Sequence, residues 1–243
     1  MTRASYARTR TVGLALVVLG MLVMAVGHGW GLFVAPREAM MGDVGRILYV
    51  HVPTAWGALV FYLVGFVAAI GTLWTGRRIF DASTTAWVEV GTLMTMLLLI
   101  QGSIWARPTW GTWWTWDPRL TTSAVLAMSF GVVLLLRRLI DQAGRRSMAT
   151  AVATIVATVN VPIVYKSVEW WNSLHQPMSS RESIDSPMWM PLMITSLGVT
   201  LLGIGLATLR TLIELSRLLA EEAAPELPEL PDRLSLTRPE ESP

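Results

Sequence analysis

Six long apolar segments leave this chain few ways to fold. They cover residues 11–35, 52–74, 87–106, 118–139, 149–168 and 189–213. A helix of about 20 apolar residues crosses a hydrocarbon core roughly 30 Å thick. No ten-residue stretch alternates apolar and polar residues, as a transmembrane barrel requires. Because a backbone in lipid must satisfy its own hydrogen bonds, the sequence predicts an all-α integral membrane protein, a bundle of six transmembrane helices.

Composition supports this interpretation. Hydrophobic residues make up 53% of the chain and charged residues only 15%, whereas soluble domains carry about 25% charged residues. The first apolar segment follows three arginines, as a signal peptide would. Its length of about 25 residues nevertheless exceeds the 7–15 residues of a signal h-region. We therefore expect it to be a retained first span.

The basic residues predict the orientation of the bundle. Of the 19 Lys and Arg residues, 13 lie at the amino terminus, in the second and fourth loops and in the carboxyl tail. Positive charge accumulates on the cytoplasmic side of membranes, so both termini are predicted to be cytoplasmic. The net charge of +2 is small, and the basic residues flank spans. They are therefore assigned to topology, and no nucleic-acid partner is expected.

We expect one transmembrane domain over residues 1–220, whose first, third and fifth loops face outward. In the fifth span, Pro162 removes a helical hydrogen-bond donor and predicts a kink near the outward end. From Glu221 onward the chain holds five prolines and seven acidic residues. Such a segment cannot bury enough apolar surface to order itself. Residues 221–243 are therefore predicted to be a disordered, acidic, proline-rich cytoplasmic tail.

All three histidines fall at outward span ends or in outward loops. His51 lies just before Pro53, which favours a helix start and would hold the imidazole at the mouth of the bundle. His175 lies in the fifth loop, and His28 lies between glycines near the end of the first span. Each can also be an interfacial or solvated histidine without a ligand, and this reading is favoured most for His28.

Two facing imidazoles can bind a metal, and the chain has no cysteine to compete with them. Zinc usually takes three or four protein ligands, and no HExxH motif or close carboxylate cluster accompanies these histidines. An iron porphyrin needs only two axial ligands from the protein, because the macrocycle supplies the other four. Haem therefore suits a site with two histidines better than a bare metal does.

A tryptophan-rich segment, WGTWWTWDP, lies between two prolines before the fourth span. Its tryptophans are Trp110, Trp113, Trp114 and Trp116. If this segment is helical, the first three share one face with Asp117 and form an indole surface for a flat apolar ligand. An interfacial aromatic belt is the alternative. Asp117 followed by Pro118 is also typical of a helix N-cap.

Two arginines are candidate partners for the propionates of a porphyrin, because a guanidinium pairs with a carboxylate through two parallel hydrogen bonds. They are Arg119, two residues after Asp117, and Arg46, five residues before His51. Arg119 can instead extend its charged end to the membrane interface.

These segments resemble those of a known family. WGTWWTWDPRL resembles the signature WGxWWxWDxRL of the haem-handling proteins of cytochrome c maturation. YVHVPTAW and EWWNSLHQP resemble the two histidine-bearing segments that flank this signature in the haem exporter protein C (CcmC) family. The resemblance covers most of the chain. Larger proteins with the same signature attach haem to apocytochromes, and their additional spans do not fit into 243 residues.

The resemblance implies a multi-pass protein of the bacterial inner membrane that holds haem b, its transported ligand, at the periplasmic face. His51 and His175 would be the axial ligands of the haem iron, and residues 108–121 would contact the haem edge. The haem would pass to a periplasmic haem chaperone (CcmE). The family acts with an ATP-binding subunit (CcmA) and the membrane subunits CcmB and CcmD. This chain has no GxxxxGK[ST] loop and is not expected to be an enzyme itself.

Two alternatives remain open from the residues. A membrane b-type cytochrome in electron transfer usually buries its histidine ligands inside spans, and spans two to six have no histidine in their middle thirds. A permease subunit that moves a small molecule would place polar residues at mid-membrane. The candidates Glu89, Gln101 and Asn160 lie near span ends.

Overall fold

The computed structural model describes residues 2–177 and 179–223. Within this part of the chain, six helical stretches are long and apolar enough to cross a membrane: Arg3–Val34, Asp43–Thr75, Arg78–Trp110, Pro118–Leu139, Ala143–Trp170 and Ser186–Ala223. The predicted six-helix architecture is confirmed. The last helix includes residues 221–223, which the sequence assigned to the tail. The rest of the predicted tail, 224–243, lies outside the described residues.

The described helices form an up-and-down series. They are α1 (Arg3–Gly29), α2 (Leu48–Thr75), α3 (Arg78–Trp110), α4 (Pro118–Leu139), α5 (Ala143–Thr158), α6 (Asn160–Trp170) and α7 (Ser186–Ala223). A π-helical turn at Trp30–Val34 follows α1, and a 3-10 turn at Asp43–Ile47 precedes α2. The fifth span divides into α5 and α6 at Val159. Because Pro162 cannot donate to the carbonyl of Thr158, the helix breaks there, as its sequence predicted.

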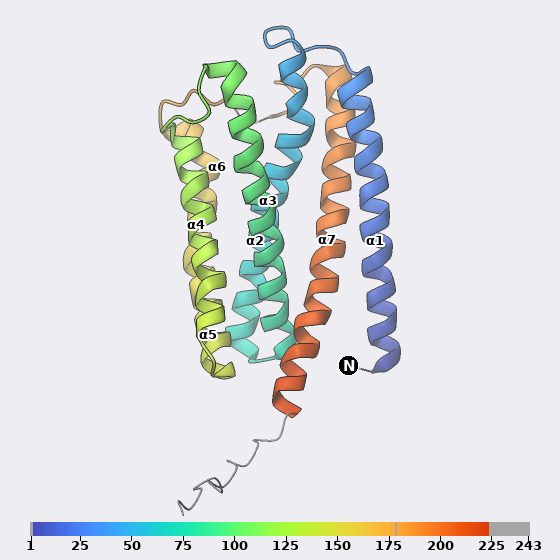
Figure 1. The fold of residues 1–243 in the computed structure, drawn as a ribbon, viewed down its shortest axis with the longest axis vertical. Coiled ribbons are helices and arrows are strands. Elements are labelled where there is room, and N and C mark those ends of the chain that lie inside the picture. Colours follow the sequence, from blue (N-terminus) through green and yellow to red (C-terminus); the bar gives the residue numbers. More distant parts are fainter. Residues whose placement is uncertain (1, 178, 224–243) are drawn as a thin grey trace, which may run out of the picture.

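The two ends of the bundle differ. Figure 1 shows α1 beside α7 on one side, α4, α5 and α6 on the other, and α2 and α3 between them. Segments 30–47, 111–117 and 171–185 join helices at the upper end in this view. We call it the histidine end, because His51 and His175 lie there. The start of α1, the end of α7 and the short α2–α3 and α4–α5 turns form the opposite end.

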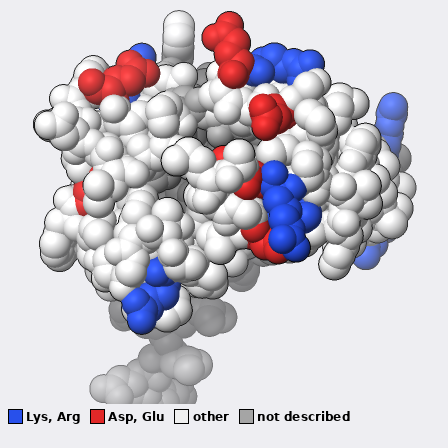
Figure 2. Space-filling view, turned by 90° about the horizontal axis from the view of Figure 1, so that it is seen from above, with Lys and Arg blue, Asp and Glu red and all other residues white. Residues whose placement is uncertain are grey.

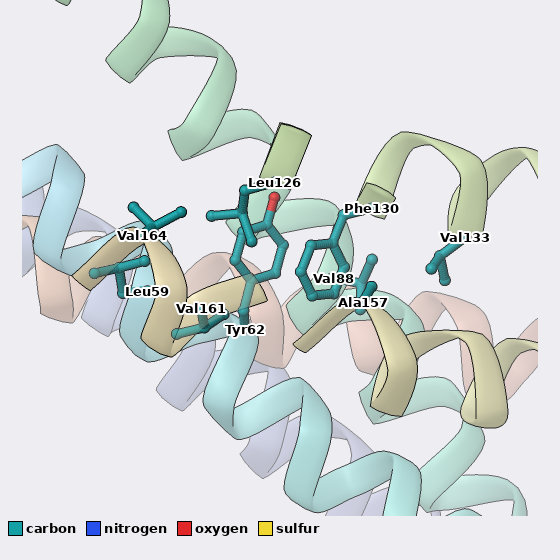
Figure 3. Packing of buried hydrophobic residues seen from close by; sticks show 9 residues of the cluster. All are labelled: Leu59, Tyr62, Val88, Leu126, Phe130, Val133, Ala157, Val161 and Val164. Carbon is teal, nitrogen blue, oxygen red and sulfur yellow. The ribbon is translucent and has the colours of Figure 1, made fainter. Parts of the chain in front are cut away.

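A buried cluster joins α2, α3, α4, α5 and α6 (Figure 3). Its members are Leu59, Tyr62, Val88, Leu126, Phe130, Val133, Ala157, Val161 and Val164. The rings of Tyr62 and Phe130 stack with centroids 3.6 Å apart and planes 9° apart. The Tyr62 hydroxyl accepts a hydrogen bond from Thr95 Oγ1 at 3.0 Å. A buried tyrosine usually needs such a partner, and this one lets its ring occupy the core.

The contact between α1 and α7 is made by glycines. Gly13, Gly20 and Gly27 recur every seven residues on α1, and Gly198 and Gly205 do so on α7. A methyl group added at Gly198 would lie 2.4 Å from the backbone nitrogen of Met24. The two backbones therefore approach as closely as glycine allows. Small residues of this kind drive helix association in lipid, where apolar burial alone gives no advantage.

A buried ion network occupies the opposite end. Arg137 of α4 donates to Asp81 of α3 at 2.7 Å and to Glu214 of α7 at 2.9 Å, and all three side chains are buried. Arg210 donates to Glu214 at 3.0 Å and to Glu89 at 2.9 Å. From its sequence, Arg137 was assigned to topology, with contact to a cytoplasmic partner as the alternative for the segment RRLIDQAGRR. In the structure it also ties three helices together.

The close approach of α1 and α7 predicts that Gly198→Ala lowers the free energy of unfolding by about 1–3 kcal/mol, because the new methyl forces two backbones apart. Thermal unfolding in detergent measures the effect. Gly131→Ala is the matched control, since a methyl there meets nothing within 4 Å. Equal stability of the two variants would contradict the packing described.

The ion network predicts that Arg137→Ala lowers the free energy of unfolding by about 3–5 kcal/mol, since two buried carboxylates lose their shared cation. Chemical denaturation in mixed micelles measures the change. The neighbouring Arg138 is exposed, so Arg138→Ala should be close to wild type. If both substitutions lower the free energy of unfolding equally, the network does not stabilise the bundle.

Candidate functional site

A cavity opens at the histidine end between α2, α3, α4 and the 171–185 segment. Its volume is about 150 Å³, well above the roughly 10–15 Å³ that a single water molecule needs. Most of its lining is aliphatic or aromatic. The polar and charged residues among the lining are His51, Ser103, Thr109, Arg119, Ser123, His175, Gln176 and Ser179.

His51 is held on a rigid element. The helix α2 begins at Leu48, earlier than its sequence suggested, so His51 lies in the first turn and Pro53 lies inside the helix. The side chain is buried, with 8% of the residue exposed. Trp105 of α3 meets the imidazole edge-on, with ring centroids 5.4 Å apart. A methyl group at Gly102 would lie 3.3 Å from His51 Cε1, so α3 closely borders the ring.

His175 lies in the 171–185 segment, which forms neither helix nor strand in its described residues. Its Nδ1 lies 2.8 Å from the carbonyl oxygen of Gln176. A carbonyl can only accept, so Nδ1 carries the proton and Nε2 keeps its lone pair for a ligand. Burial lowers the pKa of His175, and the Arg119 charge adds to this shift, whereas the Gln176 carbonyl and the Asp117 charge oppose it. The ring is therefore biased toward its neutral form.

The two imidazoles lie close enough to share one metal ion. Their centroids are 6.4 Å apart and their planes are inclined by 36°. When two imidazoles bind opposite sides of one metal ion, each metal–nitrogen bond is about 2 Å long and each ring centre lies about 1 Å beyond its nitrogen. The two ring centroids are then about 6 Å apart. The observed separation is compatible with this arrangement.

The tryptophan-rich segment is not helical, so the predicted shared face of Trp110, Trp113, Trp114 and Asp117 is wrong. The helix α3 ends at Trp110 because Gly111 takes a left-handed conformation with φ of 77°. Trp110 and Trp114 line the cavity. Trp113 and Trp116 lie outside the lining and are 59% and 82% exposed.

Asp117 and Arg119 stand at the start of α4. Asp117 is the N-cap, as its sequence suggested, and accepts from the backbone N–H of Arg119 at 2.8 Å. The same carboxylate accepts from Ser173 and from the backbone of Leu174. Asp117 is not part of the cavity lining, whereas Arg119 is. The Arg119 Nη1 also donates to the carbonyl of Val164 at 2.5 Å.

Two further candidates, Arg46 and His28, also lie outside the cavity lining. Arg46 donates to Asp43 at 3.0 Å and to the carbonyl of Gly31 at 2.9 Å. The His28 imidazole interacts with the backbone of Tyr49. The carbonyl of Tyr49 lacks its usual helical donor, because Pro53 stands four residues later.

Sequence reasoning missed one wall of the cavity. Leu98, Gly102, Trp105 and Thr109 of α3 all line it. Their spacing of four, three and four residues is the helical period and could have identified this face. Ser173 was also missed, since only folding brings it to Asp117.

Charges around the histidine end are largely balanced. Figure 2 looks onto this end and shows a mostly uncharged surface, on which several small blue and red patches lie side by side and a few blue ones stand alone. Arg37 pairs with Asp43 at 3.0 Å, and Lys166 pairs with Glu169 at 2.7 Å. Arg119 is the one Lys or Arg residue among the described residues that line the cavity.

Together, the fold and the cavity define a multi-pass helical membrane protein with a paired-histidine site at one end of its bundle. The family model described as CcmC, Heme exporter protein C, matches residues 2–224. The chain belongs to this family.

Individual relatives agree. Heme exporter protein C of Bradyrhizobium diazoefficiens is 37% identical over 172 residues, which cover 69% of this chain and 65% of the relative. The match thus spans slightly less than two thirds of that protein. The Escherichia coli K12 protein of the same name is 35% identical over 80% of each chain. The Haemophilus influenzae protein is 36% identical over 81% of this chain and 82% of its own.

The environment of His175 predicts a titration midpoint below about 6.5, because burial disfavours the imidazolium form. Carbon-13 labelling of histidine gives three NMR signals in the ligand-free protein, and His175→Ala identifies one of them by its loss. A midpoint at or above 6.5 would show that the ring is solvated and not held as described.

Proposed function

We propose that this protein binds haem b at its histidine end and transfers it to a haem chaperone during the maturation of c-type cytochromes. One observation carries the proposal. Two imidazoles, one on α2 and one in the 171–185 segment, line the same indole-bearing cavity with centroids 6.4 Å apart. Membership of the haem exporter protein C family supports the same ligand.

In this proposal His51 and His175 are the axial ligands of the haem iron. His175 offers Nε2, because its Nδ1 is engaged by the Gln176 carbonyl. A bare metal ion is a poorer candidate. In the described part of the chain, no group of three or more His, Cys, Asp or Glu side chains could hold one. The porphyrin needs only two ligands from the protein.

The remaining cavity residues suit the macrocycle. Trp105, Trp110 and Trp114 supply aromatic surface for the ring, and Arg119 supplies a cation for a propionate. Trp113 and Trp116 would contact the exposed haem edge or a partner, since they lie outside the lining. Arg46 is a weaker candidate for a propionate, because Asp43 and Gly31 already engage it.

The proposal places the protein in the bacterial inner membrane with the histidine end at the periplasmic face. Eleven of the Arg residues in the described part lie at the opposite end: Arg3, Arg8, Arg10, Arg77, Arg78, Arg137, Arg138, Arg145, Arg146, Arg210 and Arg217. This distribution favours a cytoplasmic opposite end, with both termini on that side. The proposed partners are the chaperone CcmE, the ATP-binding subunit CcmA and the membrane subunits CcmB and CcmD.

The proposal predicts that the purified wild-type protein shows the Soret band of six-coordinate, low-spin haem. Replacing either His51 or His175 with alanine should convert it to a high-spin spectrum with weaker binding, and the double replacement should abolish the band. Absorbance spectra of the proteins in detergent, normalised to protein concentration, measure this.

His28→Ala is the matched control, because His28 lies outside the cavity lining. Its spectrum should equal that of the wild type. An unchanged spectrum in the His51 and His175 double variant would exclude both residues as ligands. Loss of the band in the His28 variant, with the other two unaffected, would move the site to α1.

A further inference from the structure

The two proposed iron ligands are held in different ways. His51 is part of α2, whose backbone hydrogen bonds fix its position. His175 belongs to an irregular segment, so its position relative to His51 depends on side-chain contacts. The distance between the two imidazoles is therefore set by whatever holds residues 173–175 against the helices.

A single buried carboxylate makes these contacts. Asp117 Oδ2 accepts from the Ser173 hydroxyl at 2.9 Å and from the backbone N–H of Leu174 at 2.6 Å. Its Oδ1 accepts from the backbone N–H of Arg119 at 2.8 Å and lies 3.0 Å from Ser173 Oγ. Asp117 is only 5% exposed. Hydrogen bonds to a buried carboxylate are short and strong.

The chain of hydrogen bonds continues to the proposed ligand. Ser173 Oγ accepts from the backbone N–H of His175 at 3.0 Å. The serine hydroxyl has one proton, which it donates to Asp117, and its lone pairs remain for His175. The start of α4 is thus connected through a carboxylate and a hydroxyl to His175 itself. By contrast, Gln176 reaches the first loop through the sulfur of Met41 at 3.8 Å, a weak acceptor.

Helix capping alone does not account for this arrangement. A cap uses one hydrogen bond to the first turn, and Asn, Ser or Thr provides it as well as Asp does. Asp117 also accepts hydrogen bonds from two donors of another segment, the Ser173 hydroxyl and the Leu174 backbone N–H. A carboxylate suits both donors because it only accepts. An asparagine could keep the cap with its one carbonyl oxygen. Its NH₂ group would then face the backbone N–H of Leu174, which would lose its acceptor.

We propose that Asp117 is a positioning residue, which holds the 173–175 segment on the start of α4 and thereby sets the separation of His175 from His51. This inference rests on the proposed function, since it assumes that His175 binds the iron. It assigns Asp117 no direct contact with haem, in agreement with its absence from the cavity lining. Ser173 is a positioning residue too, because it links Asp117 to the backbone of His175.

Two variants test the inference in the full chain loaded with haem in detergent. Asp117→Asn keeps the cap, and Ser173→Ala leaves the cap untouched. Both should lower haem affinity by about 10–100-fold, as the loss of groups that orient metal ligands does. Both should also shift the spectrum from low spin toward high spin. Free imidazole should restore the low-spin spectrum, because it occupies the coordination position that the displaced His175 leaves.

Controls separate positioning from general stability. Ser173→Thr keeps the hydroxyl and should retain the wild-type spectrum. Ser167→Ala removes a buried serine hydroxyl, which donates within α6 to Val164 at 2.8 Å, and should not change haem binding. Thermal unfolding of all variants identifies any that fail to fold.

The inference is overturned if Asp117→Asn and Ser173→Ala both bind haem with wild-type affinity and spectrum. It is also overturned if they lose haem and imidazole restores nothing, since the carboxylate would then support the whole cavity and not one ligand. Failure of the proposed function is a separate result. In that case the His51 and His175 double variant keeps its spectrum, whatever the Asp117 variants do.

Discussion

The hydrocarbon core of a membrane requires every backbone N–H and C=O group to find a partner inside the protein. In this chain that requirement is met by long helices, whose sides present apolar residues to lipid. Apart from the break at Val159 inside the fifth span, irregular backbone in the described residues lies at the ends of the bundle. The segments at 111–117 and 171–185 lie at the same end because an even number of spans separates them. A cavity lined by one histidine from a helix and one from a loop can form there.

Within that end, rigid and irregular elements share the site. The helices α2 and α3 fix His51, Gly102 and Trp105 relative to one another. The other imidazole is carried by a segment without regular structure, and Asp117 links this segment to α4. A loop held by a few hydrogen bonds can move when these are broken. Such a movement would suit the proposed release of haem.

Much of the fold was predictable because the residues that determine it lie close together in the sequence. Apolar length specified the six spans, Pro162 marked the break between α5 and α6, and Asp117 with Pro118 marked the start of α4. The conformation of Gly111 was not predictable from indole spacing. It leaves Trp113 and Trp116 outside the cavity lining, although the Trp116 ring still meets that of Trp114 edge-on, with centroids 6.0 Å apart. The contacts of Asp117 with Ser173, and of Arg137 with Asp81 and Glu214, join residues more than 50 positions apart. Only the tertiary arrangement reveals them.

The most direct measurement of the central claim is a cryo-EM map of the full chain in lipid nanodiscs after loading with haem. The account predicts density for one macrocycle in the cavity, with the imidazoles of His51 and His175 on opposite faces of the iron and Trp114 in contact with the ring. A macrocycle bound elsewhere, or one whose iron is approached by neither histidine, would contradict it.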